Sequence, residues 1–231
     1  MSAERRVALL VMTDGRDELL EQTVASITTA FGLGAFAVRL MIDDTGDPAH
    51  GAELARRYPR FMVDASRERR GFAGAIARGW ELLTPLAPDY VLHVEDDFTF
   101  NGSPGWAPSL LASMLEVLEL EPRLAQVALK RQPWNDAERA AGGIVEQHPD
   151  DYTERAEHGV VWTEHRRFFT TNPCLYRGAL MARGWPLEPR SEGVFSLRLF
   201  EDPSTRCAFL GGKRDAPLVT HIGDERNGTG Y

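Results

Sequence analysis

The chain has 231 residues, of which 43% are hydrophobic, and it carries a formal net charge of −8 at neutral pH. That length is enough for one well-packed domain and short for two. The acidic balance argues against a general nucleic-acid binder, because such proteins obtain most of their affinity from Lys and Arg side chains that neutralise phosphates.

The cysteines and the apolar runs indicate where the protein works. Cys174 and Cys207 stand far apart without metal-binding spacing, which predicts isolated thiols in a reducing compartment. The apolar run at residues 7–12 is too short for the core of a signal peptide, and no later run is long enough to span a membrane. We therefore expect a cytoplasmic protein without a transmembrane segment.

Apolar runs alternate with helical patterns along the first half of the chain, which is typical of a parallel α/β sheet. Residues 7–13 predict a buried strand, and a helix with apolar residues at Leu19, Leu20, Val24 and Ile27 follows it. Further strands are predicted at residues 37–43, 61–63, 90–94 and 127–129, and further helices up to residue 54, at 74–83 and at 110–120.

Carboxylates follow two of these strands. Asp43 and Asp44 end the second strand, and Glu95, Asp96 and Asp97 follow the fourth. Because ligands of open α/β sheets bind beyond the carboxyl ends of the strands, both groups should face one site. Three adjacent carboxylates repel one another unless a cation or hydrogen-bond donors offset the repulsion. Taken alone, such a triplet is more often a solvated turn than a metal site, and the metal gains support only from the motifs around it.

Several motifs resemble the family 2 glycosyltransferases of the GT-A fold. The second strand of that family usually ends in a VDDGS-like motif and the central strand in a DxD-like motif, and this chain has MIDDTGD and HVEDDF. The segment RRGFAGAIARGW is similar to the family's NxGfagAlNrG-like segment, although Arg69 and Ala77 stand where Asn is favoured. Glu95 stands where DxD begins with Asp, and it still supplies a carboxylate.

The resemblance continues through the second half. NPCLYRGALMARGWP is similar to the family's acceptor-side segment. SEGVFSLRL resembles the stretch that usually carries a Glu-Asp pair, of which only Glu192 is present because Gly193 follows it. The closing VTHIGDERNGTGY resembles enzymes in which a late His, here His221, completes the metal site.

This resemblance implies a single α/β domain of the GT-A type, Rossmann-like, with a mostly parallel central sheet flanked by helices. Residues 1–100 would be the nucleotide-sugar-binding half and residues 101–220 the acceptor-side half. Separately, the glycine content of residues 221–231 predicts a flexible tail, which either closes over the donor through Arg226 or is a frayed terminus without function. The expected activity is the metal-dependent transfer of a sugar, with inversion, from a nucleotide-diphosphate-sugar donor to a hydroxyl group.

The resemblance also implies roles for individual residues. Asp97 and His221 would hold Mn²⁺ or Mg²⁺, and Glu192 would be the general base, with Asp202 as the reserve candidate. Glu192 is also typical of a helix start, where a carboxylate favours the dipole. The residues expected to bind the donor are Thr13, Asp43, Asp44, Arg67, Arg70, Glu95 and Asp96.

Two other functions compete with this interpretation. A non-catalytic module that binds nucleotides or sugars would use the same pocket. The segment VLHVEDDFT also approximates the hhhhDxDxT motif of haloacid-dehalogenase-like phosphatases, but Glu95 stands at the nucleophile position and its longer side chain would misplace the attacking oxygen. The acceptor stays open among a glycan, a lipid-linked intermediate, a small molecule and a modified DNA base.

Overall fold

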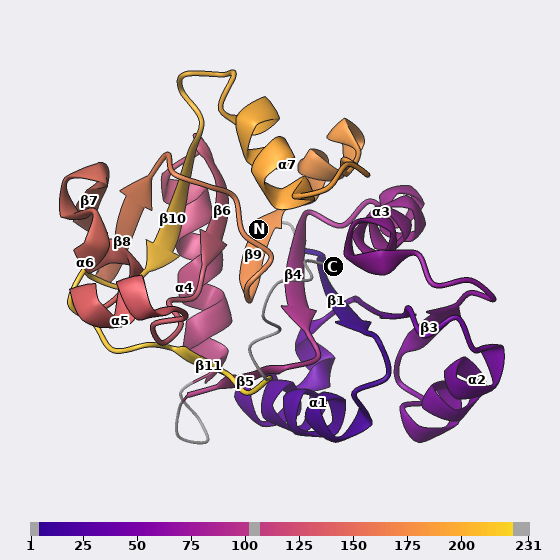
Figure 1. Cartoon of the computed structure of the whole chain (residues 1–231). Coiled ribbons are helices and arrows are strands. Elements are labelled where there is room, and N and C mark those ends of the chain that lie inside the picture. The colour runs from indigo at the N-terminus through magenta and orange to yellow at the C-terminus, as the bar shows by residue number, and fades with distance from the viewer. Residues whose placement is uncertain (1–4, 102–106, 224–231) are drawn as a thin grey trace.

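The computed structural model describes residues 5–101 and 107–223, apart from the side chains of residues 107–109. Nine of the strands in this part of the chain form one sheet (Figure 1). These strands are β1 (Val7–Thr13), β2 (Val38–Asp43), β3 (Met62–Ala65), β4 (Tyr90–Glu95), β6 (Leu124–Ala128), β7 (Tyr152–Glu157), β8 (Val160–His165), β9 (Cys174–Arg177) and β10 (Arg206–Leu210). Their order across the sheet is β3-β2-β1-β4-β9-β6-β10-β8-β7.

Most strands of this sheet run in one direction. The pairs β1/β2, β2/β3, β1/β4 and β6/β10 are parallel. The strand β9 is antiparallel to β4 and β6, and β8 is antiparallel to β7 and β10. Among the nine described strands only β8 and β9 are therefore reversed, which confirms the mostly parallel α/β sheet. A second, two-stranded antiparallel sheet pairs β5 (Phe98–Phe100) with β11 (Val219–His221).

Helices flank the large sheet (Figure 1). They are α1 (Asp17–Phe31), α2 (Pro48–Arg57), α3 (Gly71–Leu83), α4 (Ala107–Leu120), α5 (Asp136–Ala141), α6 (Ile144–Gln147) and α7 (Ser191–Leu199). Short 3-10 helices lie at Leu33–Ala35, Thr84–Leu86, Pro149–Asp151 and Gly178–Arg183. Within the described ranges, none of these helices is both long enough and apolar enough to cross a membrane.

Apolar side chains pack on both faces of the sheet. Along β1, Leu9 and Val11 belong to the cluster that contains the buried residues of α1 and α4, whereas Leu10 and Met12 belong to the cluster that contains those of α3 and α7. Every residue of β1 is buried. This two-sided burial explains why the strand is continuously apolar instead of alternating.

Some boundaries differ from those that the apolar pattern predicts. The helix α3 begins at Gly71, three residues before the predicted start, and β6 spans Leu124–Ala128, so it also begins three residues before its predicted start and ends one residue early. Arg70, which precedes α3, carries no side-chain cap, so the sequence offers no start signal there. Such shifts leave the order of elements unchanged.

Candidate functional site

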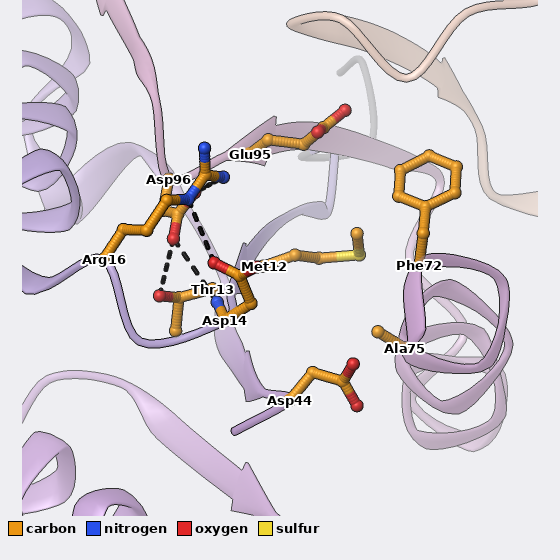
Figure 2. A pocket seen from close by; sticks show the side chains of 9 residues that line it. All are labelled: Met12, Thr13, Asp14, Arg16, Asp44, Phe72, Ala75, Glu95 and Asp96. Atoms are coloured by element: carbon orange, nitrogen blue, oxygen red, sulfur yellow. Dashed lines mark hydrogen bonds and ion pairs between the residues drawn. The ribbon is translucent and has the colours of Figure 1, made fainter. Parts of the chain in front are cut away.

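The carboxyl ends of β1, β2 and β4 meet the first turn of α3 at one pocket (Figure 2). The strand β1 lies between β2 and β4, so the segments that follow these three strands are neighbours. This is the site that the two carboxylate groups predict. The pocket encloses about 10 Å³, which is room for roughly one water molecule. Its lining residues are Met12, Thr13, Asp14, Arg16, Asp44, Phe72, Ala75, Glu95 and Asp96.

One arginine occupies the carboxylate side of this pocket. The turn after β1 contains Gly15 with a φ of 96°, a conformation that favours glycine, and it directs Arg16 across the ends of β1 and β4. Arg16 Nε donates to Asp14 Oδ1 over 3.0 Å, and its other two guanidinium nitrogens donate to Asp96 and Asp97. Sequence reasoning missed Arg16, because a charged residue before a helix is unremarkable without knowledge of the distant carboxylates.

Asp96 ties the ends of β1 and β4 together. Its Oδ2 accepts hydrogen bonds from Thr13 Oγ1 over 2.7 Å and from the Asp14 amide over 3.4 Å, and its main-chain carbonyl accepts from Thr23 Oγ1 over 2.8 Å. Burial raises the pKa of Asp96 to about 6, although the charge of Arg16 opposes this rise. Thr13 and Asp96 therefore hold the ends of β1 and β4 together in addition to lining the pocket.

Asp97 lies beside His221, which comes from the far end of the chain. The pairing of β5 with β11 sets His221 opposite Phe98, and His221 Nε2 is 3.1 Å from Asp97 Oδ2. The other oxygen, Oδ1, is buried and has no hydrogen-bond partner among the described residues. Burial alone would raise the pKa of Asp97, but the hydrogen bond with His221 and the charge of Arg16 lower it. A Cβ added to Gly223 would lie 2.5 Å from Asp97 Oδ2, so the chain approaches Asp97 closely there.

Asp97 and His221 fit a divalent cation as part of its coordination shell. Carboxylate oxygen suits Mg²⁺ and Mn²⁺, and the buried, unpartnered Oδ1 is an available ligand atom. In the described part of the chain, no group of three His, Cys, Asp or Glu side chains is arranged around one metal position. The cation would therefore take its remaining ligands from phosphate oxygens and water, as Mg²⁺ commonly does.

Glu192, in the first turn of α7, belongs to a second carboxylate cluster. Its Oε1 accepts from the Thr171 amide over 2.7 Å and lies 2.8 Å from Thr171 Oγ1. The same hydroxyl is 3.0 Å from Glu95 Oε1, so Thr171 links the predicted base to a residue of the pocket. Burial raises the pKa of Glu192. Asp202, the reserve candidate, lies in an exposed turn where its carboxylate accepts from the Ser204 amide over 2.8 Å.

The two carboxylates that end β2 have different surroundings. Asp43 is 1% exposed, and it accepts from the Thr45 amide over 3.1 Å and contacts His50 Nδ1 at 2.9 Å. Asp44 lines the pocket instead; its Oδ1 accepts from the Arg70 amide over 2.7 Å, and its buried Oδ2 has no hydrogen-bond partner among the described residues, although Arg69 Nε lies 4.0 Å away. Asp44 is therefore placed to meet a ligand, whereas Asp43 braces the loop after β2.

Arg67 and Arg70 line a neighbouring groove and are not part of the carboxylate pocket. This groove has a volume of about 720 Å³ and runs beside α3. Arg70 pairs with Asp64 at 3.6 Å. Arg69 connects the two hollows, because it also lines the groove while its Nη2 donates to Asp14 Oδ2 over 2.8 Å.

Most of the predicted C-terminal tail, residues 221–231, lies outside the described residues. His221, Ile222 and Gly223 are described, and the Ile222 amide donates to the Asp97 carbonyl over 2.8 Å. Residues 224–231, which include Arg226, lie outside the described ranges.

Comparisons with other proteins give structural relatives only. No protein-family model matches the chain, and no curated protein matches it in sequence. Among solved structures, the chain is similar to residues 1–349 of TarS from S. aureus, with a TM-score of 0.62 and 13% identity, over 94% of this chain and 60% of that one. TarS has also been solved in complex with UDP-GlcNAc.

Two further solved structures share this architecture. A mannosyltransferase from Pyrobaculum calidifontis, in complex with GDP-Man and Mn²⁺, matches with a TM-score of 0.60 and 15% identity over 97% of this chain and 59% of that one. GalNAc-T7, with UDP, GalNAc and Mn²⁺, matches with a TM-score of 0.66 and 9% identity over 96% of this chain and 45% of that one. The chain thus spans about half the length of these proteins and has the GT-A fold.

Proposed function

We propose that this protein is a metal-dependent glycosyltransferase that moves a sugar, with inversion, from a nucleotide-diphosphate-sugar donor to a hydroxyl group. The observation that carries the proposal is the Asp97–His221 pair with its buried, unpartnered carboxylate oxygen at the end of β4. Structures of the same fold support it, since two of them contain Mn²⁺ together with a nucleotide or nucleotide sugar.

The donor would bind at the carboxyl ends of β1, β2 and β4. Asp44, with one oxygen that accepts no hydrogen bond from the described residues, would accept hydrogen bonds from the base or ribose. Thr13, Glu95 and Asp96 would complete the wall of that pocket. A divalent cation at Asp97 and His221 would supply positive charge beside the leaving diphosphate.

The basic groove beside α3 would extend the donor site. Arg67 and Arg70 would approach the diphosphate from that groove, because guanidinium groups form paired hydrogen bonds with phosphate oxygens. Asp43 would act indirectly by holding the loop that presents Asp44.

Glu192 would act as the general base. The acceptor oxygen forms a bond with the anomeric carbon while the bond to the diphosphate breaks and the diphosphate takes the electron pair. The hydroxyl proton passes to the Glu192 carboxylate, whose raised pKa improves it as a proton acceptor. A single displacement of this kind inverts the anomeric configuration.

The two halves of the chain would divide these tasks. Residues 1–100 would bind the donor and residues 101–220, which include Glu192, would face the acceptor. The acceptor is proposed only as a hydroxyl group, on a glycan, a lipid-linked intermediate, a small molecule or a modified DNA base. Cys174 and Cys207 are both buried free thiols, which is consistent with the proposed cytoplasmic location.

A panel of nucleotide sugars tests the proposal. Each donor is added with Mn²⁺ or with EDTA, and both the melting temperature and donor hydrolysis are measured. A true donor at a hundred times its Kd should stabilise the fold by about 2.7 kcal/mol, and only with metal. Stabilisation without sugar release or transfer would favour the non-catalytic module. The absence of any metal-dependent stabilisation across the panel would contradict the proposal.

A further inference from the structure

The donor pocket is almost filled by the protein's own side chains. Its enclosed volume of about 10 Å³ is far below the roughly 300–1,000 Å³ that ligand pockets usually provide. Figure 2 shows the Arg16 guanidinium beside Asp96 on one side and Phe72 and Ala75 on the other. This pocket alone is too small for a nucleotide sugar, so a donor would also occupy the neighbouring groove, and any part of it that reached Asp96 or Asp97 would displace Arg16.

Arg16 is the long, flexible side chain at this place. Its side chain is 19% exposed, whereas those of Asp96 and Asp97 are 1% and 6% exposed, so it enters the cluster from the solvent side. Its three nitrogens each contact a different carboxylate, including that of Asp14. Asp97 Oδ2 is contacted by both Arg16 and His221.

We propose that Arg16 is a positioning residue that exchanges partners during donor binding, an inference that rests on the proposed function. Without a donor, its guanidinium holds the carboxylates of Asp96 and Asp97 in place. With a donor, the guanidinium moves onto the diphosphate, and Asp97 becomes available to the divalent cation together with His221.

Electrostatics favour this exchange. Asp14, Asp96 and Asp97 carry up to three negative charges; Arg16 contacts all three carboxylates, and the half-exposed Arg69 contacts only Asp14. A divalent cation brings two positive charges to the cluster, and the released guanidinium gains paired hydrogen bonds to phosphate oxygens. Metal and nucleotide should therefore bind with positive coupling, each raising the affinity for the other.

The test measures Mn²⁺ binding by electron paramagnetic resonance of the free ion, in the folded full chain, with and without UDP or GDP. Arg16→Gln should bind Mn²⁺ about tenfold more tightly than wild type without nucleotide, because the competing cation is gone. With Mn²⁺ present, the same variant should bind the better of UDP and GDP about tenfold more weakly. The coupling between metal and nucleotide should shrink accordingly.

Arg69→Gln is the matched control. Arg69 also donates to Asp14, over 2.8 Å, but its side chain is 52% exposed, and its other carboxylate contact within the described residues is Asp44, at 4.0 Å, instead of Asp96 or Asp97. Its loss should change the Mn²⁺ affinity without nucleotide far less than the loss of Arg16, because Arg69 is half exposed and contacts only Asp14 of the three carboxylates. If Arg16→Gln does not fold, Arg16→Lys serves instead, because one ammonium cannot reach three carboxylates; its effects should have the same direction and be smaller.

Three other outcomes would contradict the proposed exchange of partners by Arg16. Wild-type Mn²⁺ affinity in the folded Arg16 variant, or weaker affinity, overturns the exchange while leaving metal use intact. Unchanged nucleotide affinity overturns the transfer of Arg16 to the diphosphate. If wild type binds no Mn²⁺ even with nucleotide, the metal in the proposed function fails and the exchange fails with it.

Discussion

Replacing Glu192 by Gln separates the proposed proton transfer from the packing of α7. The Gln side-chain oxygen can still accept from the Thr171 amide and hydroxyl, which lie 2.7 and 2.8 Å from Glu192 Oε1. The variant loses only the carboxylate's ability to take a proton. General-base catalysis contributes about 10²–10⁴ in rate, which corresponds to roughly 2.7–5.4 kcal/mol of transition-state stabilisation. We therefore expect kcat to fall at least about a hundredfold, with donor affinity within about threefold of wild type.

The assay compares kcat with the Kd of the donor from titration calorimetry, and Asp202→Asn provides the matched control. Asp202 is an exposed carboxylate bonded to the Ser204 amide, so its variant should retain the wild-type kcat. A Glu192→Gln enzyme with wild-type kcat, or an Asp202→Asn enzyme with the larger loss, would refute the assignment. A product that retains the donor's anomeric configuration would refute the single displacement.

The remaining predictions concern pH and the metal site. Burial raises the pKa of Glu192 in the folded protein above its pKa in the unfolded chain, so unfolding releases a proton at pH values between the two, and wild type loses stability as pH rises through this window. The melting temperature of Glu192→Gln should therefore rise relative to that of wild type over the same window. The variant should also lack the fall in kcat/KM that wild type shows at acidic pH. Asp97→Asn should lower turnover roughly a hundredfold and remove the response to EDTA, as initial rates will show. Gly223→Ala should weaken Mn²⁺ binding several-fold, because its Cβ would lie 2.5 Å from Asp97 Oδ2. Calorimetry should show about tenfold weaker nucleotide binding for Asp44→Asn, whereas Asp43→Asn should chiefly lower the melting temperature.

The sequence predicted the elements whose signal is local. The strands β1 and β4 are covered on both faces and therefore read as continuous apolar runs. The strand β7 gave no such signal, because it lies at the sheet edge and five of its six residues are exposed. The short β9 takes its place between β4 and β6 by pairing, which no local pattern reveals.

The position of the candidate site could be predicted from the sequence, whereas most contacts between its side chains could not. Carboxylates at strand ends are visible in one dimension, and the topology of α/β sheets brings them together. Asp43 and Asp44 are adjacent in sequence, and only their hydrogen-bond partners in the fold show that Asp43 holds the loop after β2 while Asp44 faces the pocket. Arg16 lies 80 residues from Asp96 along the chain, so its contact with that carboxylate depends entirely on the fold.

The small β5–β11 sheet explains how a late histidine meets an early carboxylate. The chain passes from β4 through Asp97 into β5, and pairing with β11 places His221 beside Asp97 across 124 positions. Gln132, which follows β6, holds the main chain of His221 with two hydrogen bonds. Its Oε1 accepts from the His221 amide over 3.0 Å, and its Nε2 donates to the His221 carbonyl over 2.8 Å. The geometry of the proposed metal ligands thus depends on residues of the acceptor-side half, so the donor-binding half would not form this site alone.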